Sequence, residues 1–424
     1  MRAAATKLRL RATVAKASSS PNIFNATVHL IALFTTRHCN TKKSLPLTFP
    51  FNPQGLGKQE RTDVSKLDIE IGKAAACVDE VIHEWLEKQS VTSIRREIPQ
   101  IHLSLEEQRT LQAGLASLDV TDSASGIRHM PVLGQLLESV LATEKIQQLR
   151  NFPKSREVAM IVRGLPLDPQ LPATPYDLEP GIENLSTLAG AILSVLQTLQ
   201  TRPLAYEGES SDTVFRHVSP KQKRETEKSS YGSRADLDMH VDNPHLPLTC
   251  EPVSQLSACP EYLTLTGLRC ELDVPTRIVA IDEVLAILPT WVEEEMSRPK
   301  FTVRRPASFG KHGNVLENVP LLYRSATDGL YCRYNKASVE TTCANAQFAL
   351  QLFAAAANHA DVVHHILLQP GDMLIFKNQQ TLHARDGFTP RYDGRDRWML
   401  RVFGVNDPAR VVPLDPDQPY IVRA

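Results

Sequence analysis

Three side chains in the sequence are of types that bind metal ions, and they occur in two distant segments. His240 and Asp242 are separated by one residue in HVDNPHL, and His383 lies downstream in NQQTLHARDG. On a β-strand alternate side chains share a face, so His240 and Asp242 could both reach one ion. Two imidazoles and one carboxylate on one face of a metal suit Fe(II) and leave positions open, although Zn²⁺ would tolerate the same ligands. We expect these residues to form a catalytic metal site.

Two arginines follow His383 at fixed spacings. Arg397 lies fourteen residues after His383, and Arg401 lies four residues further on, around the strand-like run WMLRVFGV. An even separation on a strand puts both guanidinium groups on one face, with their Cα atoms about 13 Å apart. Because like charges facing a protein interior are costly, we expect a different anion near each, held in a bidentate way. Internal salt bridges are the alternative, with these candidate partners: Asp386, Asp393 and Asp396.

The elements that must position these side chains change in character near residue 150. Before it, apolar residues recur at steps of three and four and predict helices over residues 67–86, after Ser104, and over 133–149, the second opened by a capping box with Glu107. After it, helices are expected over 182–200 and 344–357. Short strand-like runs otherwise predominate, at 158–166, 263–268, 276–281, 323–325, 366–368, 373–376 and 398–405.

Strands of this length, with turn signals and few strand–helix alternations, favour an α+β fold over a Rossmann-type sheet. We expect a double-stranded β-helix, the jelly-roll or cupin-like core, with flanking helices. The predicted organisation is a basic, disordered extension over residues 1–65, a helical section over 66–150 that packs on the core, and a jelly-roll domain over 151–424. Residues 206–236 are rich in Ser, Lys and Glu and are expected to form an exposed lid loop.

Composition limits the classes of function. The formal net charge of −1 offers no argument for nucleic acid or a membrane surface, and no apolar run approaches the roughly 20 residues of a membrane span. The seven cysteines are widely spaced without a C-x-x-C pair, which argues against a disulfide framework or structural zinc and for a reducing compartment. We expect a small-molecule substrate and a cytoplasmic location. Residues 1–59 contain basic residues but no Asp or Glu, so an organellar transit peptide is the alternative to an extension or residues upstream of the true start.

Other residues with chemical potential have structural interpretations. His245 lies on a proline-flanked loop and is expected to be a structural or substrate-contacting group, not a metal ligand. His364 and His365 are expected within a strand as packing or edge residues. Cys250, Cys259 and Cys270 are too far apart for a zinc finger and are expected to be buried thiols.

Two segments carry a family resemblance. HVDNPHL and GDMLIFKNQQTLHARDGFTPRYDGRDRWMLRVF resemble the Fe(II)/2-oxoglutarate-dependent oxygenases of the TauD/clavaminate synthase-like group. Within this group the sequence is most similar to free amino-acid hydroxylases, including those of arginine, asparagine and lysine. The runs RGLP at 163–166 and SSYGSR at 229–234 are also similar to that subgroup, and the resemblance covers roughly residues 150–410.

The resemblance implies roles for individual residues. His240, Asp242 and His383 would bind Fe(II), and Arg397 would hold the distal carboxylate of 2-oxoglutarate, with O2 as the second co-substrate. The remaining matched positions would contact the substrate: Arg401, Ser230, Arg333 and Asn335. In the arginine hydroxylases the segment around residue 335 supplies carboxylates, whereas Asn335 is neutral, which puts a guanidinium substrate in doubt. The related halogenases lack the carboxylate that Asp242 provides, so hydroxylation or desaturation is favoured over halogenation.

The sequence thus predicts hydroxylation of an unactivated C–H bond of a small carboxylate, a free amino acid above all. Oxidation of a sulfonate, or of an amino acid tethered to a carrier protein, is the first alternative. A catalytically inactive metal-binding relative is the second, and intact ligands together with Arg397 argue against it. A zinc hydrolase would give no role to Arg397.

Overall fold

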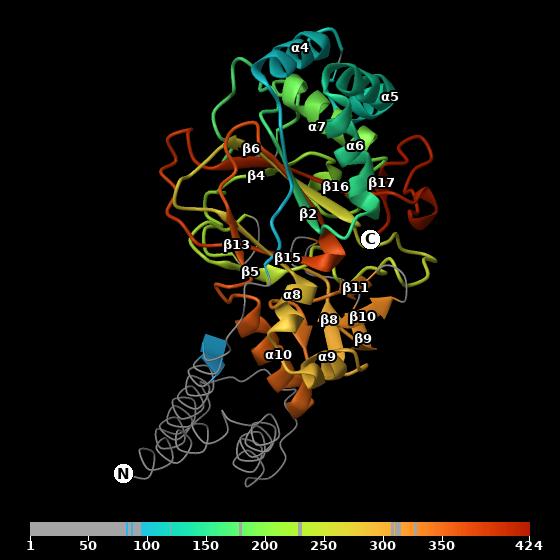
Figure 1. Ribbon diagram of the computed structural model, residues 1–424, viewed down its shortest axis with the longest axis vertical. Helices are drawn as coiled ribbons and strands as arrows, with labels where there is room; N and C mark the ends of the chain where they lie inside the picture. Colours follow the sequence, from blue (N-terminus) through green and yellow to red (C-terminus); the bar gives the residue numbers. More distant parts are fainter. Residues whose placement is uncertain are drawn as a thin grey trace, which may run out of the picture.

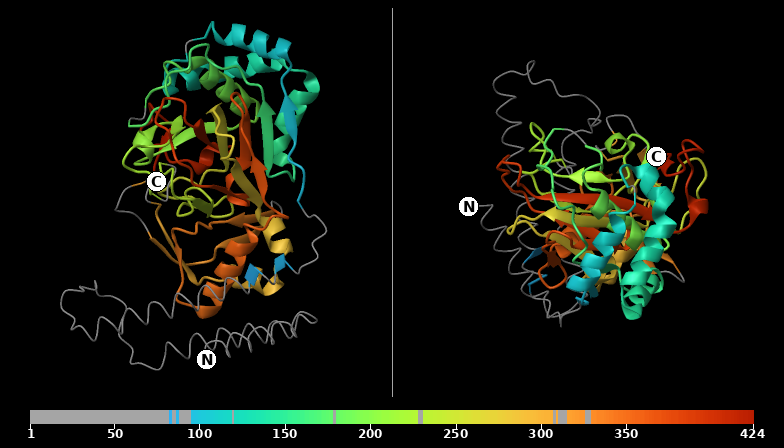
Figure 2. Two further views of the ribbon diagram at one scale, coloured as in Figure 1. Left: turned by 90° about the vertical axis from the view of Figure 1, so that its left-hand side faces the viewer. Right: turned by 90° about the horizontal axis from the view of Figure 1, so that it is seen from above.

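The computed structural model describes residues 82–83, 86–87, 95–118, 120–177, 180–227, 231–306, 309, 315–325 and 329–424. Within these ranges α-helices and β-strands are mixed along the chain. Helices α4, α5 and α7 lie at one end of the molecule, and α8, α9 and α10 lie at the other, with the main sheets between them (Figures 1 and 2). The helix expected over 67–86 falls largely outside the described residues.

The larger sheet has eight strands in the order β1-β2-β14-β6-β16-β3-β17, with β4 paired to β16. Its central pairs are antiparallel, whereas β1 with β2 and β17 with β3 are parallel at the two edges. Its strands are β1 (Gln100–His102), β2 (Ala159–Arg163), β3 (Arg202–Tyr206), β4 (Arg216–Val218), β6 (Tyr262–Arg269), β14 (Met373–Lys377), β16 (Trp398–Val405) and β17 (Ile421–Val422).

A second sheet has four strands, all antiparallel, in the order β13-β7-β15-β5. These strands are β13 (His364–Ile366), β7 (Thr276–Ala280), β15 (Thr381–Arg385) and β5 (Leu237–His240). The chain passes from β14 in the large sheet to β15 in this one through a short 3-10 turn, η5 (Asn378–Gln380). This crossing places the segment with His383 beside β5.

Shorter strands and three helices lie on the same side of the molecule as the four-stranded sheet. Strands β8 (Phe301–Arg304), β9 (Val315–Val319) and β12 (Val339–Glu340) form a three-stranded sheet, and β10 (Leu322–Ser325) pairs with β11 (Gly329–Cys332). Helices α8 (Ile281–Ala286), α9 (Thr290–Met296) and α10 (Ala344–Ala356) pack beside them. Of these elements, the sequence predicted only β10 and α10.

The N-terminal helices cover the other end of the large sheet. Helix α4 (Leu105–Leu115) begins with the predicted capping box between Ser104 and Glu107. The prediction of a single helix over residues 133–149 is wrong. Helix α5 (Ser123–Val140) ends before Leu141, whose backbone is extended, and α6 (Thr143–Asn151) begins anew. Helix α7 (Ser186–Thr198) is almost entirely buried and packs against α5.

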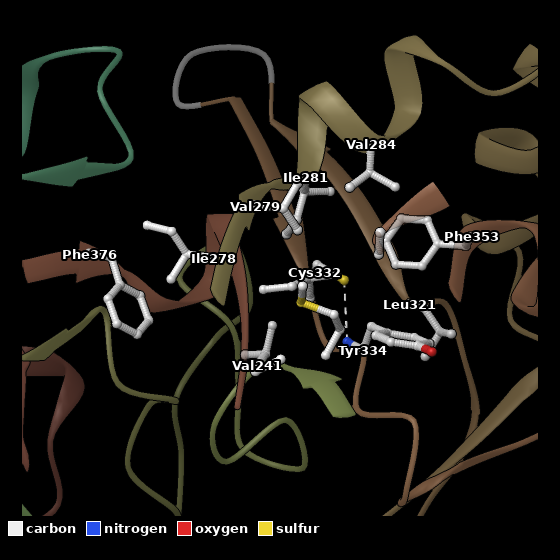
Figure 3. Packing of buried hydrophobic residues seen from close by; sticks show 14 of the residues in the cluster. Val241, Ile278, Val279, Ile281, Val284, Leu321, Cys332, Tyr334, Phe353 and Phe376 are labelled. Atoms are coloured by element: carbon white, nitrogen blue, oxygen red, sulfur yellow. Dashed lines mark hydrogen bonds between the residues drawn. The ribbon is translucent and has the colours of Figure 1, made fainter. Parts of the chain in front are cut away.

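Two buried apolar clusters hold these layers together. One lies between the two sheets and includes Leu263, Ile278, Leu382 and Phe403, and it continues under α8 and α10. Figure 3 shows part of it, in which Phe376 lies near Ile278, Val241 lies near Cys332, and the Tyr334 amide donates to the Cys332 thiol. The other cluster lies between the large sheet and the N-terminal helices. Val241, the residue before Asp242, is part of the cluster between the two sheets, so the segment that carries Asp242 packs against the core.

Most strand predictions after residue 150 are confirmed, with β13 displaced toward the N-terminus of the run expected at 366–368. The prediction of buried thiols holds for Cys259 but is wrong for Cys250, which is exposed, and for Cys270, which is half-buried. The range 206–236, expected as a lid, contains β4, and the lid itself stays a prediction. Among the described residues, no helix has the length and apolar character needed to cross a bilayer.

Candidate metal centre

His240 and His383 face each other across two antiparallel strands. His240 is the last residue of β5, and His383 is the central residue of β15 and its direct partner in the register. Directly opposed side chains on one face of an antiparallel pair are close neighbours. Both imidazoles are buried, and their ring centroids are 4.0 Å apart. Strand pairing therefore brings together two residues that are far apart in the sequence.

Asp242 joins them from the turn that follows β5. The expectation that His240 and Asp242 share one strand is wrong, because β5 ends at His240. Asn378 instead fixes the backbone of Asp242: its Oδ1 accepts from the Asp242 amide at 3.0 Å, and its Nδ2 donates to the Asp242 carbonyl at 3.1 Å. The next residue, Asn243, has a left-handed backbone with φ 53°, which turns the chain away. Asp242 is thus aimed at the histidines by tertiary contacts.

The ligand atoms of these three side chains converge on one point. They lie within 4.8 Å of one another. Nε2 of His240 is 3.5 Å from one Asp242 oxygen, and Nε2 of His383 is 3.9 Å from the other. Nδ1 of His240 lies 2.8 Å from the carbonyl oxygen of Asp238. That bond keeps the proton on Nδ1 and leaves the Nε2 lone pair for a metal.

Burial and neighbouring charges keep His383 and Asp242 in protonation states that can bind a metal. Burial, followed by the neighbouring His240, lowers the pKa of His383 to about 3, so its imidazole is neutral at neutral pH. Burial alone would raise the pKa of Asp242, but the Arg401 guanidinium and the two imidazoles hold it well below its usual range. A half-buried carboxylate beside two buried imidazoles matches the donor set of a divalent transition metal. The residues present therefore fit Fe(II).

Arg397 is a buried cation whose hydrogen-bond partner, Thr276, lies on β7, the strand paired with β15. It directly precedes β16 and is 4% exposed. Its Nη2 donates to the Thr276 hydroxyl at 3.1 Å, its Nε has no partner, and among the described residues no carboxylate forms a salt bridge with it. Burial, followed by the nearby Arg385, lowers the pKa of Arg397 to about 9. A guanidinium in this state is suited to a carboxylate that arrives with a ligand.

Arg401 has a different environment from the one expected. Its Nη2 donates to Glu209 at 2.7 Å, and its Nη1 donates to Asp242 at 3.3 Å. Glu209 is also buried, and it accepts from Arg216 at 3.2 Å and from Asn243 at 3.1 Å. Arg401 therefore has internal carboxylate partners. They are not the candidates suggested by proximity in the sequence, Asp386, Asp393 and Asp396.

The other predicted substrate residues lie in varied positions. Arg333 is 1% exposed, donates to the Pro244 carbonyl at 2.9 Å, and forms a salt bridge with Glu251. Asn335 pairs with His240 through an isolated backbone bridge, while its Oδ1 accepts from the Ala337 amide. Ser230 lies outside the described residues. Substrate contact remains a prediction for all of these positions.

Two residues at the centre were not singled out from the sequence. Glu209 lies in a polar stretch without periodicity, and nothing in its spacing indicates that it is buried beside Arg401. Asn378 is completely buried in η5, in the KNQQTLH run that precedes His383. A polar residue between two apolar strands, five positions before a candidate ligand, was the available signal.

Comparison with known proteins gives consistent matches. A family model described as taurine catabolism dioxygenase TauD, TfdA family, matches residues 299–403. The L-lysine 3-hydroxylase of Catenulispora acidiphila is 26% identical over 315 residues, which cover 73% of this chain and 84% of the relative. The L-asparagine oxygenase of Streptomyces coelicolor is 28% identical over 272 residues, which cover 63% and 76%, respectively.

The fold also matches a solved structure. A crystal structure of asparagine oxygenase in complex with Fe(II), hydroxyasparagine and succinate aligns with a TM-score of 0.67 at 23% identity, over 77% of this chain and 99% of that one. The family match ends at Phe403, so it includes both His383 and Arg397. The chain is therefore similar to the TauD/TfdA family over residues 299–403, and over a larger part of its length to a lysine hydroxylase and an asparagine oxygenase.

Proposed function

We propose that the protein hydroxylates an unactivated C–H bond of a free amino acid, with His240, Asp242 and His383 holding Fe(II). The observation that carries this proposal is the convergence of their ligand atoms within 4.8 Å. Three protein ligands on one side of a metal leave room for a bidentate co-substrate and for O2. The double-stranded β-helix expected from the sequence is supported by two sheets around a shared core, one antiparallel throughout and one antiparallel except at its two edges.

Arg397 is the residue that would bind the distal carboxylate of 2-oxoglutarate. Its burial, its unpartnered Nε and the lack of a carboxylate partner among the described residues support this role. The Thr276 hydroxyl, which accepts from Arg397, would orient the guanidinium. Arg385 does not compete for the ligand, because it donates to the backbone carbonyls of Gly232, Ser233 and Asp386.

The opposite charges of Glu209 and Arg401 support a zwitterionic substrate. Both side chains are buried and lie 2.7 Å apart, directly beside Asp242. A free amino acid carries an ammonium that Glu209 would accept and a carboxylate that Arg401 would bind. The names of the two relatives, a lysine hydroxylase and an asparagine oxygenase, are consistent with this substrate class. A sulfonate without an ammonium group would give Glu209 nothing to bind beyond its internal partners Arg216, Arg401 and Asn243.

When bound, Fe(II) and 2-oxoglutarate supply the activation of O2 that inserts one oxygen atom into a C–H bond and converts 2-oxoglutarate to succinate and CO2. The protein contributes geometry. Asn378 fixes the backbone of Asp242, and Arg401 engages one of its oxygens. Arg385 anchors residues 232–235 beside β15 and so helps to enclose the site. An enclosed site keeps water from the reacting groups.

The test is anaerobic addition of Fe(II) and 2-oxoglutarate to the purified protein. A weak visible charge-transfer band should appear and should be lost in His383→Ala. His365→Ala, on the exposed side of β13, is the matched control and should keep the band. Under air, succinate formation should depend on one member of an amino-acid panel. A protein that forms no band and no succinate with any amino acid would falsify the proposal.

A further inference from the structure

His245 is a buried polar side chain. It is 2% exposed, and neither ring nitrogen has a hydrogen-bond partner among the residues that the structure describes. The ring packs edge-on against Phe309, with centroids 5.0 Å apart. An unsatisfied buried donor or acceptor costs about 1–3 kcal/mol, so such groups call for an explanation, such as a bound ligand.

Two arginines act on this imidazole. The guanidinium of Arg305 lies 4.4 Å from the Phe309 ring centroid, on the same ring that His245 contacts. Its Nη2 makes a long bond of 3.4 Å to the Glu207 carbonyl, and its Nε is buried with no partner in the described part of the chain. Arg333 donates from Nη1 to the Pro244 carbonyl and from Nη2 to Glu251, and its Nε likewise has no partner there. The pKa of His245 is lowered to about 3. Burial is the largest cause, and the positive charges of Arg305 and Arg333 add to it.

Of the two arginines, Arg305 is the cation left for a ligand. Within the described part of the chain it forms no salt bridge, whereas Arg333 is paired with Glu251. Two acidic groups, Glu207 and Glu209, act electrostatically on Arg305. Glu207 is exposed, and Glu209 is engaged by Arg216 and Arg401. An additional negative charge near Arg305 is therefore favourable.

One short segment joins these groups to the metal centre. Asp242 faces the histidines, Asn243 donates to Glu209, the Pro244 carbonyl accepts from Arg333, and His245 follows. The Cα atoms of Asp242 and His245 are three residues apart, a span of at most roughly 11 Å. This span is similar to the length of an amino acid from its α-carbon to the end of a long side chain.

We propose that Arg305, His245 and the Nε of Arg333 form a subsite for an anionic group at the distal end of the substrate's side chain. The substrate is then an amino acid with a second carboxylate, and this assignment rests on the proposed function. Arginine N–H groups and an imidazole N–H offer donors to such a group, and the positive charge of Arg305, which no salt bridge offsets among the described residues, disfavours a cationic side chain. The neutral Asn335 offers no compensating charge.

The test measures binding of amino acids of matched length to the anaerobic Fe(II)–2-oxoglutarate form by calorimetry. L-glutamate and L-aspartate should bind at least tenfold more tightly than L-glutamine, L-asparagine and L-lysine. Arg305→Gln should weaken binding of the preferred acid about tenfold to hundredfold and leave binding of its amide nearly unchanged. His245→Phe, which keeps an aromatic ring against Phe309, should also weaken binding of the acid.

Arg304→Gln is the matched control, because the neighbouring Arg304 is exposed and paired with Glu340. It should bind every ligand as the unaltered protein does. The visible band with Fe(II) and 2-oxoglutarate checks folding in each variant. Tighter binding of an amide or of lysine than of either acid overturns the subsite and leaves the proposed function standing. Equal losses for acid and amide in Arg305→Gln also overturn it. An intact band with no amino acid bound overturns the proposed function itself.

Discussion

His383 lies directly opposite His240 in the antiparallel pairing of β15 with β5, and their ring centroids are 4.0 Å apart. The register of this single strand pair determines whether a metal site exists. A slip of one residue would turn one imidazole to the opposite face of the sheet. The register shifts between His383 and Arg385, after the pairing of the two histidines, and so leaves that pairing intact.

Arg397→Ala should separate co-substrate binding from metal binding. The loss of a bidentate, charge-assisted contact predicts that the 2-oxoglutarate concentration needed for half-maximal signal rises by about tenfold to hundredfold. Iron binding should change little, because Arg397 does not contact the three ligands. Titration of the visible band with each component measures both quantities. The exposed Arg395→Ala is the control, and equal loss of iron and 2-oxoglutarate binding would contradict the role given to Arg397.

Asn378→Ala should weaken the metal site without removing a ligand. The amide of Asn378 makes two hydrogen bonds to the backbone of Asp242 and one to Pro260. Its loss leaves these buried groups unsatisfied, so the free energy of unfolding should fall by about 1–3 kcal/mol. Iron affinity should fall by about tenfold to hundredfold. Urea unfolding and anaerobic iron titration measure the two effects, and an unchanged iron affinity would argue against the positioning role.

Glu209 and Arg401 should be strongly coupled in the metal-free protein. Glu209→Gln leaves the buried Arg401 and Arg216 without their shared carboxylate and should lower the free energy of unfolding by about 3 kcal/mol or more. The double variant with Arg401→Gln should cost less than the sum of the single variants. A double-mutant cycle by urea unfolding measures this coupling. The exposed Arg304–Glu340 pair serves as the control and should show no measurable coupling; additive losses at Glu209 and Arg401 would refute the prediction.

The stability of the protein should fall between pH 7 and pH 5 in part because of His245. Its pKa is lowered from 6.5 to about 3, so the unfolded chain binds a proton near pH 6.5 that the folded chain excludes until much lower pH. Stability therefore rises with pH across this window, and His245 alone contributes about 2 kcal/mol of the change. Urea unfolding should show a shallower dependence in His245→Leu. Above pH 7.5 the two curves should run parallel, and a slope unaltered below pH 7 would contradict the assignment.

Much of the fold after residue 150 follows from local pattern. The runs at 373–376 and 398–405 are mostly apolar and are flanked by turn residues, and they form β14 and β16. The helix boundary at Leu141 was missed because apolar spacing continues from α5 into α6 across a change of direction. Strands β8, β9 and β12 were missed because they are short, partly exposed and stabilised by pairing with one another.

The sequence by itself determined which residues could perform the chemistry. His240, Asp242, His383 and Arg397 were recognisable because residue type and spacing are local properties. Only the tertiary structure decided the rest. It paired β5 with β15, placed Asp242 by means of Asn378, and gave Arg401 the partner Glu209. These contacts join segments more than a hundred residues apart, and long-range burial and strand register, which no local pattern encodes, determine them.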